Sequence, residues 1–312
     1  MTTYFAPTGS GIGDVIVCLP VCEWLTAHST EPVVLVARGP RQVNLSSVIP
    51  GLAGEVREVD LAEVMKPGDR FINLRDHPLQ KHHDWFSEEF QKSYPDFRIT
   101  EILSVICRDF NIPADLSAIK PFRYSVDERS RGKVILIPGT TVKVKMMRPH
   151  FWLNLYHELK DMGTDCLIVG LLERCNDIKS LVDAGVPHIE TPSIEQAINL
   201  ISSAQSVVAV DTGLMHIAVQ QGVKTVAIHG KCEIYYRPAE NCIPIYTNSF
   251  HRSAATKIEL PNRWDACADG SEPQCDFPVM YDTWDWDPPG VEDGDYVMFD
   301  DHKRIIELLC PL

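Results

Sequence analysis

The sequence predicts an α/β protein made of two doubly wound domains that face each other across a cleft. Short apolar segments rich in Val and Ile, typical of buried parallel strands, recur along the 312 residues. Segments with apolar residues at helical spacing alternate with them. A polar stretch over residues 113–132 separates a first series of strand–helix units from a second. Repeated strand–helix units on both sides of a linker indicate two doubly wound domains.

The composition excludes several classes of protein. It is 45% hydrophobic and 23% charged, as in ordinary globular proteins, and its net charge of −14 argues against nucleic acid or anionic membranes as partners, although a local basic groove stays open. No apolar run is long enough for a membrane span, and the N-terminus lacks the pattern of an export signal. We therefore expect a cytoplasmic protein whose ten cysteines are reduced thiols rather than disulfides or zinc ligands.

The first domain is predicted to begin with a strand over Thr3–Ala6, a glycine-rich turn over 9–13 and a helix in which Pro20 makes a kink or sits at a tolerated position. The glycines have the spacing GxGxG, and no acidic residue ends the next strand, so the dinucleotide fingerprint is weak. Asp14 lies in the first turn of the helix. It is either a helix cap or, beside a flexible glycine loop, a candidate general base.

The rest of the first domain is predicted to add strands at Pro32–Ala37, Glu55–Val59 and Phe71–Leu74, and a helical stretch over 86–112. His and Asp residues gather over 76–84, but their spacing fits no standard set of metal ligands, so an exposed loop is expected there. The linker ends in the charged run DERSRGK, which we expect to be solvated.

The second domain is predicted to repeat the same alternation. Helices are expected at His150–Met162, Asn176–Ala184 and Ile194–Ala204, the last with a capping box formed by Ser193 and Gln196. The expected strands are Val134–Ile137, Cys166–Val169, His188-Ile189, Val207–Val210, Val223–Ile228 and Ile243–Tyr246.

The end of the chain has an unusual composition. From Trp264 to His302 it has no Lys or Arg, many acidic residues and interleaved aromatic ones. This segment is either a solvated acidic loop or a surface for an acceptor or partner. A closing helix is expected at Asp301–Leu309.

The most informative stretch covers residues 206–229 and reads SVVAVDTGLMHIAVQQGVKTVAIH. A buried strand ends at Asp211-Thr212-Gly213, and a helix starts there and ends at Gly222. The first turn of such a helix presents backbone N–H groups and the positive end of its dipole, which suit a phosphate or pyrophosphate. Gly213 would let a ligand approach the backbone, and Thr212 could donate its hydroxyl. Alternatively, Asp211 or Thr212 merely caps the helix.

Ligands of doubly wound domains bind at the carboxyl ends of the strands. In this sequence those ends are followed by residues 9–14, 140–145, 170–173, 211–213 and 230–233. One cleft between the two domains could gather all five segments.

Three motifs resemble those of the heptosyltransferase-like glycosyltransferases of family nine. They are GIGDVIVCLPVCEWL at 11–25, IPGTTVKVKMMRPHFW at 137–152 and SIEQAINLISSAQSVVAVDTGLMHIAVQQGVKTVAIHG at 193–230. The resemblance implies the GT-B architecture of two Rossmann-like domains. Residues 1–130 would form the acceptor-side domain, 131–299 the nucleotide-sugar-binding domain with the acidic, aromatic-rich segment, and 300–312 the closing helix.

The resemblance also implies an activity. It is an inverting, metal-independent transfer of a sugar from a nucleoside-diphosphate donor, the co-substrate, to the hydroxyl of a glycan or another acceptor. Asp14 matches the general base that accepts the proton of the hydroxyl. Lys145, or else Lys143, is the candidate cation that stabilises the leaving diphosphate. The remaining implied donor-binding residues are Gly13, Thr140, Thr141, Glu173, Asp211, Thr212, Gly213 and His216.

Some alternatives stay open at this point. His216 supports the phosphate loop or is a helix histidine satisfied by a neighbour. The chain could be a nucleotide-sugar-binding protein of the same fold without catalytic activity. A third alternative, a dinucleotide oxidoreductase, is supported by the glycines at 9–13 alone. The identities of the donor base, the sugar and the acceptor, and the oligomeric state, are not readable from the sequence.

Overall fold

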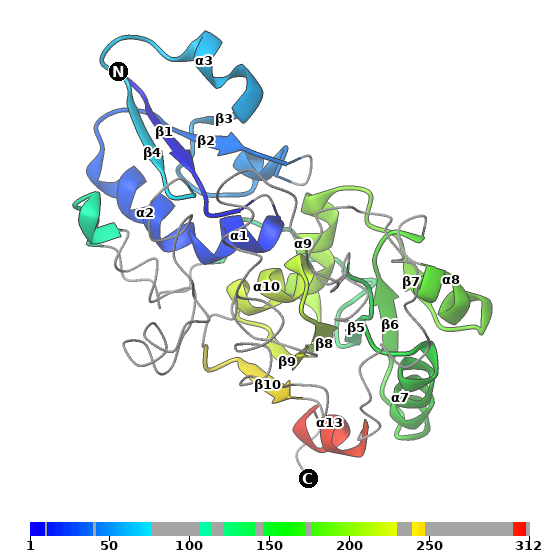
Figure 1. Cartoon of the computed structure of the whole chain (residues 1–312). Coiled ribbons are helices and arrows are strands. Elements are labelled where there is room, and N and C mark those ends of the chain that lie inside the picture. Colours follow the sequence, from blue (N-terminus) through cyan, green and yellow to red (C-terminus); the bar gives the residue numbers. More distant parts are fainter. Residues whose placement is uncertain are drawn as a thin grey trace, which may run out of the picture. The chain divides into compact units, whose positions relative to one another are not determined.

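The computed structural model describes residues 1–9, 11–39, 42–75, 107–113, 121–140, 146–172, 176–229, 239–246 and 302–309. These residues form two compact α/β units that divide between Arg123 and Tyr124, and each unit has its own parallel sheet (Figure 1). The predicted α/β class is thereby confirmed. The cleft between the domains stays a prediction.

The first unit contains a four-stranded sheet in the order β3-β2-β1-β4, with every neighbouring pair parallel. The chain runs outward through β1, β2 and β3 and then returns to place β4 on the other side of β1, so the order reverses between β1 and β4. Such a switch point is where doubly wound sheets bind ligands. The bounds are β1 Thr3–Ala6, β2 Val33–Ala37, β3 Gly54–Arg57 and β4 Arg70–Asn73, with helices α1 Ile12–Val17, α2 Leu19–His28 and α3 Leu61–Val64 and short 3-10 turns at Leu45–Ser47 and Glu58–Asp60.

The predicted helix after the glycine turn is two helices, α1 and α2, which meet at Cys18. Pro20 lies in the first turn of α2. Proline has no N–H to continue the hydrogen bonds of the preceding helix but is well tolerated in a first turn, so the chain starts a new helix there.

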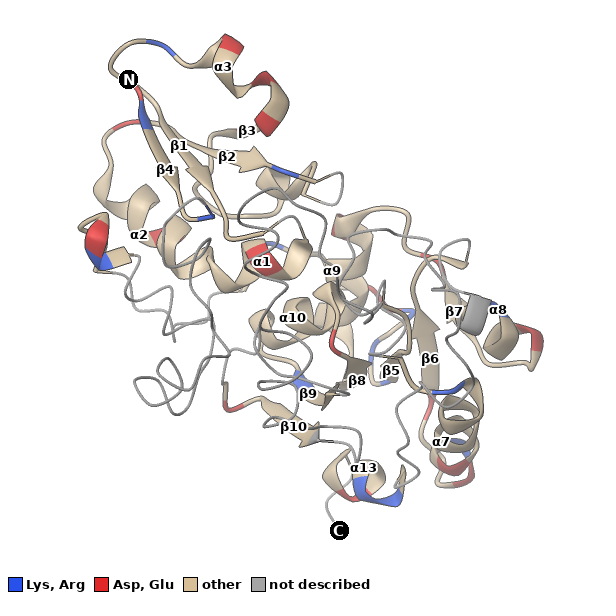
Figure 2. Cartoon of the chain, in the orientation of Figure 1, with Lys and Arg blue, Asp and Glu red and all other residues tan. Residues whose placement is uncertain are grey.

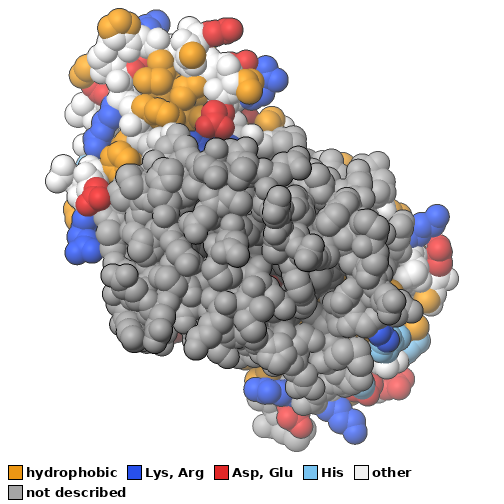
Figure 3. Space-filling model, viewed as in Figure 1, with side chains coloured by type: hydrophobic (Ala, Val, Ile, Leu, Met, Phe, Trp, Pro, Cys, Tyr) orange, Lys and Arg blue, Asp and Glu red, His pale blue; other side chains and the backbone are white. Residues whose placement is uncertain are grey.

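The first unit contains a small hydrophobic cluster. Tyr4, Ala6, Val36 and Leu61 form a buried cluster against which partly buried residues pack. Figure 3 shows apolar side chains at the surface in the upper part of the view, where Figure 1 places α3 and the strands of this unit.

The second unit contains a six-stranded parallel sheet in the order β10-β9-β8-β5-β6-β7. Counted from β5, this is the 3-2-1-4-5-6 order of dinucleotide-binding domains, with its switch point between β5 and β8. β5, β6 and β8 contain no charged residue and are tan in Figure 2, as expected for strands covered on both faces. The bounds are β5 Val134–Ile137, β6 Cys166–Val169, β7 His188–Ile189, β8 Ser206–Val210, β9 Lys224–His229 and β10 Cys242–Tyr246.

Helices α7, α8 and α13 of the second unit share one hydrophobic core cluster with strands of its sheet. Trp152 and Phe151 are its largest buried side chains, and Ile305 and Leu309 of the closing helix belong to the same cluster. The closing helix is also joined to α7 by a contact of 2.7 Å between His302 Nε2 and Glu158 Oε1. The bounds are α7 Pro149–Asp161, α8 Asn176–Asp183, α9 Ile194–Ser203, α10 Gly213–Gln220 and α13 His302–Leu309.

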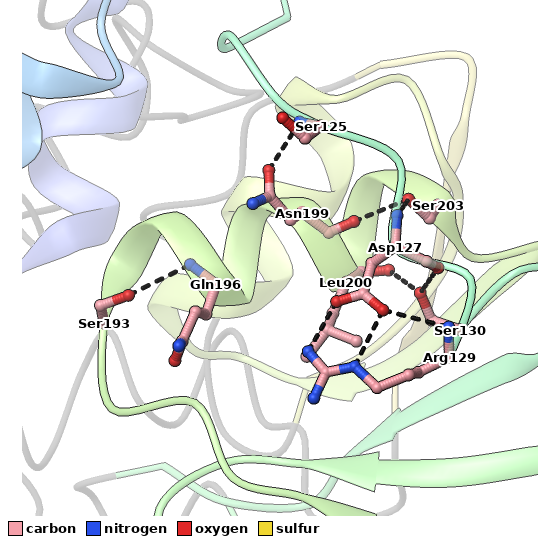
Figure 4. A network of polar contacts seen from close by, with 9 residues as sticks. All are labelled: Ser125, Asp127, Arg129, Ser130, Ser193, Gln196, Asn199, Leu200 and Ser203. Atoms are coloured by element: carbon pink, nitrogen blue, oxygen red, sulfur yellow. Dashed lines mark hydrogen bonds and ion pairs between the residues drawn. The ribbon is translucent and has the colours of Figure 1, made fainter.

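The polar segment predicted as a solvated linker is attached to α9 over its second half (Figure 4). The Ser130 hydroxyl, which is fully buried, donates to the carbonyl of Leu200 at 2.7 Å. Two backbone N–H groups are also bound, from Ser125 to Asn199 Oδ1 and from Asp127 to Ser203 Oγ, each at 2.8 Å. The predicted solvation of the charged run is therefore wrong for Ser130, which is buried against α9. The composition of the segment could not reveal the attachment to α9, because the buried hydrogen bond depends on a single serine hydroxyl.

The two arginines of this segment do face solvent. The side chains of Arg129 and Arg131 are 58% and 64% exposed, and each pairs with a near neighbour, Asp127 and Glu128 respectively. The hydrogen bonds from Arg129 hold the pKa of Asp127 below its usual value. The predicted solvation of the charge run is confirmed for these arginines.

Within the described part of the chain, no helix combines the length and the apolar character needed to cross a membrane. Five cysteines fall among the described residues, and all five are buried thiols outside any disulfide: Cys18, Cys22, Cys107, Cys166 and Cys242. The prediction of reduced thiols is confirmed for these five.

Candidate functional site

Asp14 lies at the carboxyl edge of the first sheet, where the loop after β1 enters α1. Its Oδ2 accepts the backbone N–H of Gly11, the residue before the helix, at 2.8 Å. The capping interpretation is therefore confirmed. It is compatible with the role of general base, because a carboxylate has two oxygens and several lone pairs, and this side chain is only partly buried.

The glycine at position 9 makes room for this carboxylate. A Cβ on Gly9 would lie 2.4 Å from Asp14 Cγ and Oδ2 and 2.5 Å from Oδ1, where real Cβ atoms are not found. In the dinucleotide fingerprint a glycine makes room for the pyrophosphate of the ligand. Here the chain's own Asp14 takes that space, which weakens the alternative of a dinucleotide oxidoreductase.

Gln42, in the turn after β2, holds the same loop from the other side. Its Nε2 donates to the carbonyls of Gly9 at 2.9 Å and Gly11 at 3.1 Å, and its Oε1 accepts the N–H of Arg38 at 2.8 Å. The side chain is fully buried. This role was not predictable from the sequence, because one glutamine after a strand matches no pattern.

Arg38 joins the ends of two strands at this edge. Its Nη2 donates to Asn73 Oδ1, at the end of β4, at 2.8 Å and lies 2.9 Å from Glu58 Oε1. The Arg38 side chain is only 3% exposed. Its hydrogen bond to Asn73 therefore adds a side-chain link between β2 and β4, on the two sides of β1.

In the second unit, α10 starts directly after β8, as predicted. Thr212 precedes the helix in an extended conformation, with φ −151° and ψ 162°, and its side chain makes no capping hydrogen bond. The capping alternative is therefore wrong for Thr212. Gly213 is the first residue of the helix. Gly213 and Leu214 are partly buried, whereas Met215 is fully buried.

His216 and Asp211 lie together at the start of α10. The distance from His216 Nε2 to Asp211 Oδ1 is 3.8 Å, and the two side chains are 7% and 10% exposed. This distance is longer than a hydrogen bond, so both alternatives for His216 stay predictions.

Thr140 follows β5, the neighbour of β8. The last paired residues of these strands are Ile137 and Ala209, so Thr140 and Asp211 both lie just beyond the paired region, at the switch point of the sheet. Gly13, in α1, lies at the switch point of the first sheet. The predicted residues Thr141, Lys143, Lys145 and Glu173 lie outside the described residues.

The Cys18 thiol, whose Sγ lies 3.8 Å from Thr8 Oγ1 at the start of the loop after β1, is not suited to nucleophilic catalysis. Burial, with a smaller contribution from the negative charge of Asp14, raises the pKa of Cys18 to about 12. A thiol with such a pKa is protonated at neutral pH and is a poor nucleophile.

Within the described ranges, no three His, Cys, Asp or Glu side chains are grouped as metal ligands would be. The His- and Asp-rich residues 76–84 lie outside those ranges.

Comparison with known proteins shows which family this arrangement of strands and helices resembles. The model of glycosyltransferase family 9 (heptosyltransferase) matches residues 110–262, which include every strand of the second sheet. Among curated proteins, none matches this chain in sequence.

Solved structures of glycosyltransferases share the fold. The family 9 glycosyltransferase of Veillonella parvula is 13% identical, with a TM-score of 0.60 over 79% of this chain and 86% of its own. The heptosyltransferase WaaC of E. coli, solved with ADP-2-deoxy-2-fluoro heptose, is 14% identical, with a TM-score of 0.58 over 80% and 94%. The iron-containing dodecameric glycosyltransferase TibC of enterotoxigenic E. coli is 13% identical, with a TM-score of 0.57 over 86% and 74%.

At these identities the solved structures show the fold alone, while the family model bears on the sequence itself. Together they define a glycosyltransferase with the GT-B fold. More particularly, residues 110–262 of the chain are similar to the glycosyltransferases of family 9 (heptosyltransferase).

Proposed function

We propose that this enzyme transfers a sugar, with inversion, from a nucleoside-diphosphate donor to an acceptor hydroxyl, with Asp14 as the general base. The acceptor oxygen attacks the anomeric carbon and the bond from that carbon to the diphosphate breaks. The proton of the hydroxyl passes to the Asp14 carboxylate, and the diphosphate leaves with the bonding electrons. The observation that carries the proposal is the placement of Asp14 at the switch point of its sheet, held by Gly11 and given room by Gly9.

The diphosphate is proposed to bind at the first turn of α10. This eight-residue helix starts at the switch point of the second sheet, and Thr212 does not cap it. The N–H groups and dipole of a first turn act most strongly on the negative charge that grows on the leaving group. Lys145 or Lys143 would add a cation, and Glu173 would hold the ribose.

ADP-heptose is the first donor to test, because WaaC was solved with an analogue of it. Metal independence also belongs to the proposal. TibC is described as iron-containing, whereas the described residues of this chain include no grouped set of metal ligands. Full turnover after treatment with EDTA would support metal independence, and loss of turnover that iron restores would contradict it.

The test is a transfer assay with a panel of nucleotide sugars, combined with calorimetric titration of ADP. Asp14→Asn should bind ADP as the wild type does but lose nearly all turnover, because the amide cannot accept the proton. Asp69→Asn is a matched control. Asp69 also accepts backbone N–H groups, from Thr2 at 2.8 Å and Lys66 at 2.9 Å, but it lies just before β4, at the opposite edge of the same sheet.

Asp69→Asn should keep its turnover. If Asp14→Asn turns over as fast as Asp69→Asn, Asp14 is not the base. If the wild-type protein binds nucleotide sugars and transfers none, the alternative of a non-catalytic binding protein is correct.

A further inference from the structure

We propose that Gln42 is a positioning residue for catalysis, which acts on Asp14 through the loop after β1. Its effect on turnover rests on the proposed function of Asp14. Its hold on the loop does not, because it follows from the contacts alone.

One amide group of Gln42 makes three hydrogen bonds. Two go from Nε2 to the carbonyls of Gly9 and Gly11, which lie on either side of residue 10, and the third comes to Oε1 from the N–H of Arg38. Because Nε2 and Oε1 belong to one rigid plane, these bonds fix the loop relative to the end of β2. The loop has two glycines and is therefore costly to order by itself.

The link from Gln42 to the carboxylate passes through a single residue. Gly11 gives its carbonyl to Gln42 at 3.1 Å and its N–H to Asp14 Oδ2 at 2.8 Å. A shift of Gly11 therefore moves the partner of the carboxylate directly. Gly9, the other residue bound by Gln42, is the one whose backbone lies against Asp14.

The chemistry of these bonds requires a glutamine. The loop offers two acceptors and β2 offers one donor, so the side chain must donate twice and accept once, as a primary amide does. An ionised glutamate cannot donate, and methionine of similar size makes no comparable bonds. The carbonyls of Gly9 and Gly11, whose bonds to Gln42 are partly buried, would then lose a partner, which costs stability.

The experiment compares Gln42→Met with the wild type by hydrogen–deuterium exchange and by steady-state kinetics with ADP-heptose, or with the donor the panel identifies. Exchange at the amides of residues 9–17 should rise roughly tenfold, as expected for the loss of about one net hydrogen bond. Turnover should fall roughly ten- to hundredfold through misplacement of the base, while the affinity for ADP stays unchanged.

Ser130→Ala is the matched control. It also removes a buried side chain that bonds two backbone carbonyls, those of Asp127 and Leu200, but it does so at the start of the second unit. It should lower stability without changing exchange at 9–17 or turnover. If Gln42→Met does not fold, Gln42→Glu provides the test, because it keeps the acceptor for Arg38 and loses both donors.

The outcomes separate the two proposals. Unchanged exchange at residues 9–17 in a folded Gln42 variant would overturn the positioning role. The role would also be overturned if the loop loosened while turnover stayed at the wild-type rate, given an inactive Asp14→Asn. A fully active Asp14→Asn would instead overturn the proposed base and leave the hold of Gln42 on the loop standing.

Discussion

The substitution Gly9→Ala tests the site with a single methyl group. The new Cβ would lie 2.4 Å from Asp14 Cγ, whereas carbon atoms in contact prefer about 3.5 Å, so the carboxylate or the loop must move by about 1 Å. The backbone at Gly9 is outside the left-handed region, so alanine itself adds no strain there. The perturbation is therefore almost purely a displacement of Asp14 and its loop relative to each other.

Two free energies follow from that displacement. Loss of the bond from Gly11 to this partly exposed carboxylate should cost about 1–2 kcal/mol of folding stability, offset by about 0.5 kcal/mol because alanine restricts the unfolded chain. Misplacing a catalytic group by about 1 Å can cost about 100-fold in rate, or roughly 2.7 kcal/mol of activation free energy. Turnover should thus suffer more than stability.

The assay measures turnover at saturating donor and urea unfolding on the same samples. Gly54→Ala is the control, because a Cβ at Gly54 meets nothing within 4 Å, and it should leave turnover unchanged. Turnover by Gly9→Ala within about twofold of the control would refute the claim that Asp14 must stay where the loop holds it.

Three further predictions concern stability and thiols. Ser130→Ala should lower the free energy of unfolding by about 1–2 kcal/mol in urea titrations, because a buried hydroxyl bond is lost. Because Arg129 holds the pKa of Asp127 below its usual value, this pair stabilises the fold above about pH 4, and the contribution is lost as the pH falls through the folded-state pKa. Arg129→Ala should therefore flatten the dependence of stability on pH below about 4. At pH 8, iodoacetamide should modify Cys18 and Cys22 only after unfolding, because burial raises both pKa values, that of Cys18 to about 12; modification detected by mass spectrometry in the folded protein would contradict this.

The elements that were predicted correctly are those with a clear hydrophobic pattern or with a residue that clearly ends a helix. Apolar runs such as Val134–Ile137 and Thr3–Ala6 are strands with the predicted bounds, and Gly222 follows α10 with φ +73°. The capping of α9 by Ser193, which accepts the Gln196 N–H at 3.3 Å, was also predictable, because a local contact follows from a local spacing.

What the sequence could not reveal are contacts between segments far apart. Gln42 bonds to residues more than thirty positions earlier, and Ser130 to Leu200, seventy positions later. Single polar residues of this kind are not part of a repeating pattern. Their role depends on which distant segments are brought together by the fold. The glycine pattern at 9–13 was visible, but only the coordinates reveal that Gly9 accommodates Asp14.

The proposed binding of the diphosphate to the first turn of α10 can be tested directly. Hydrogen–deuterium exchange should be measured with and without saturating ADP, or the nucleoside diphosphate that binds best. Exchange should slow at the first-turn amides of α10, residues 213–215, and stay unchanged at the start of α9, whose first turn Ser193 already caps. Binding that leaves exchange at 213–215 unchanged would contradict the proposed site.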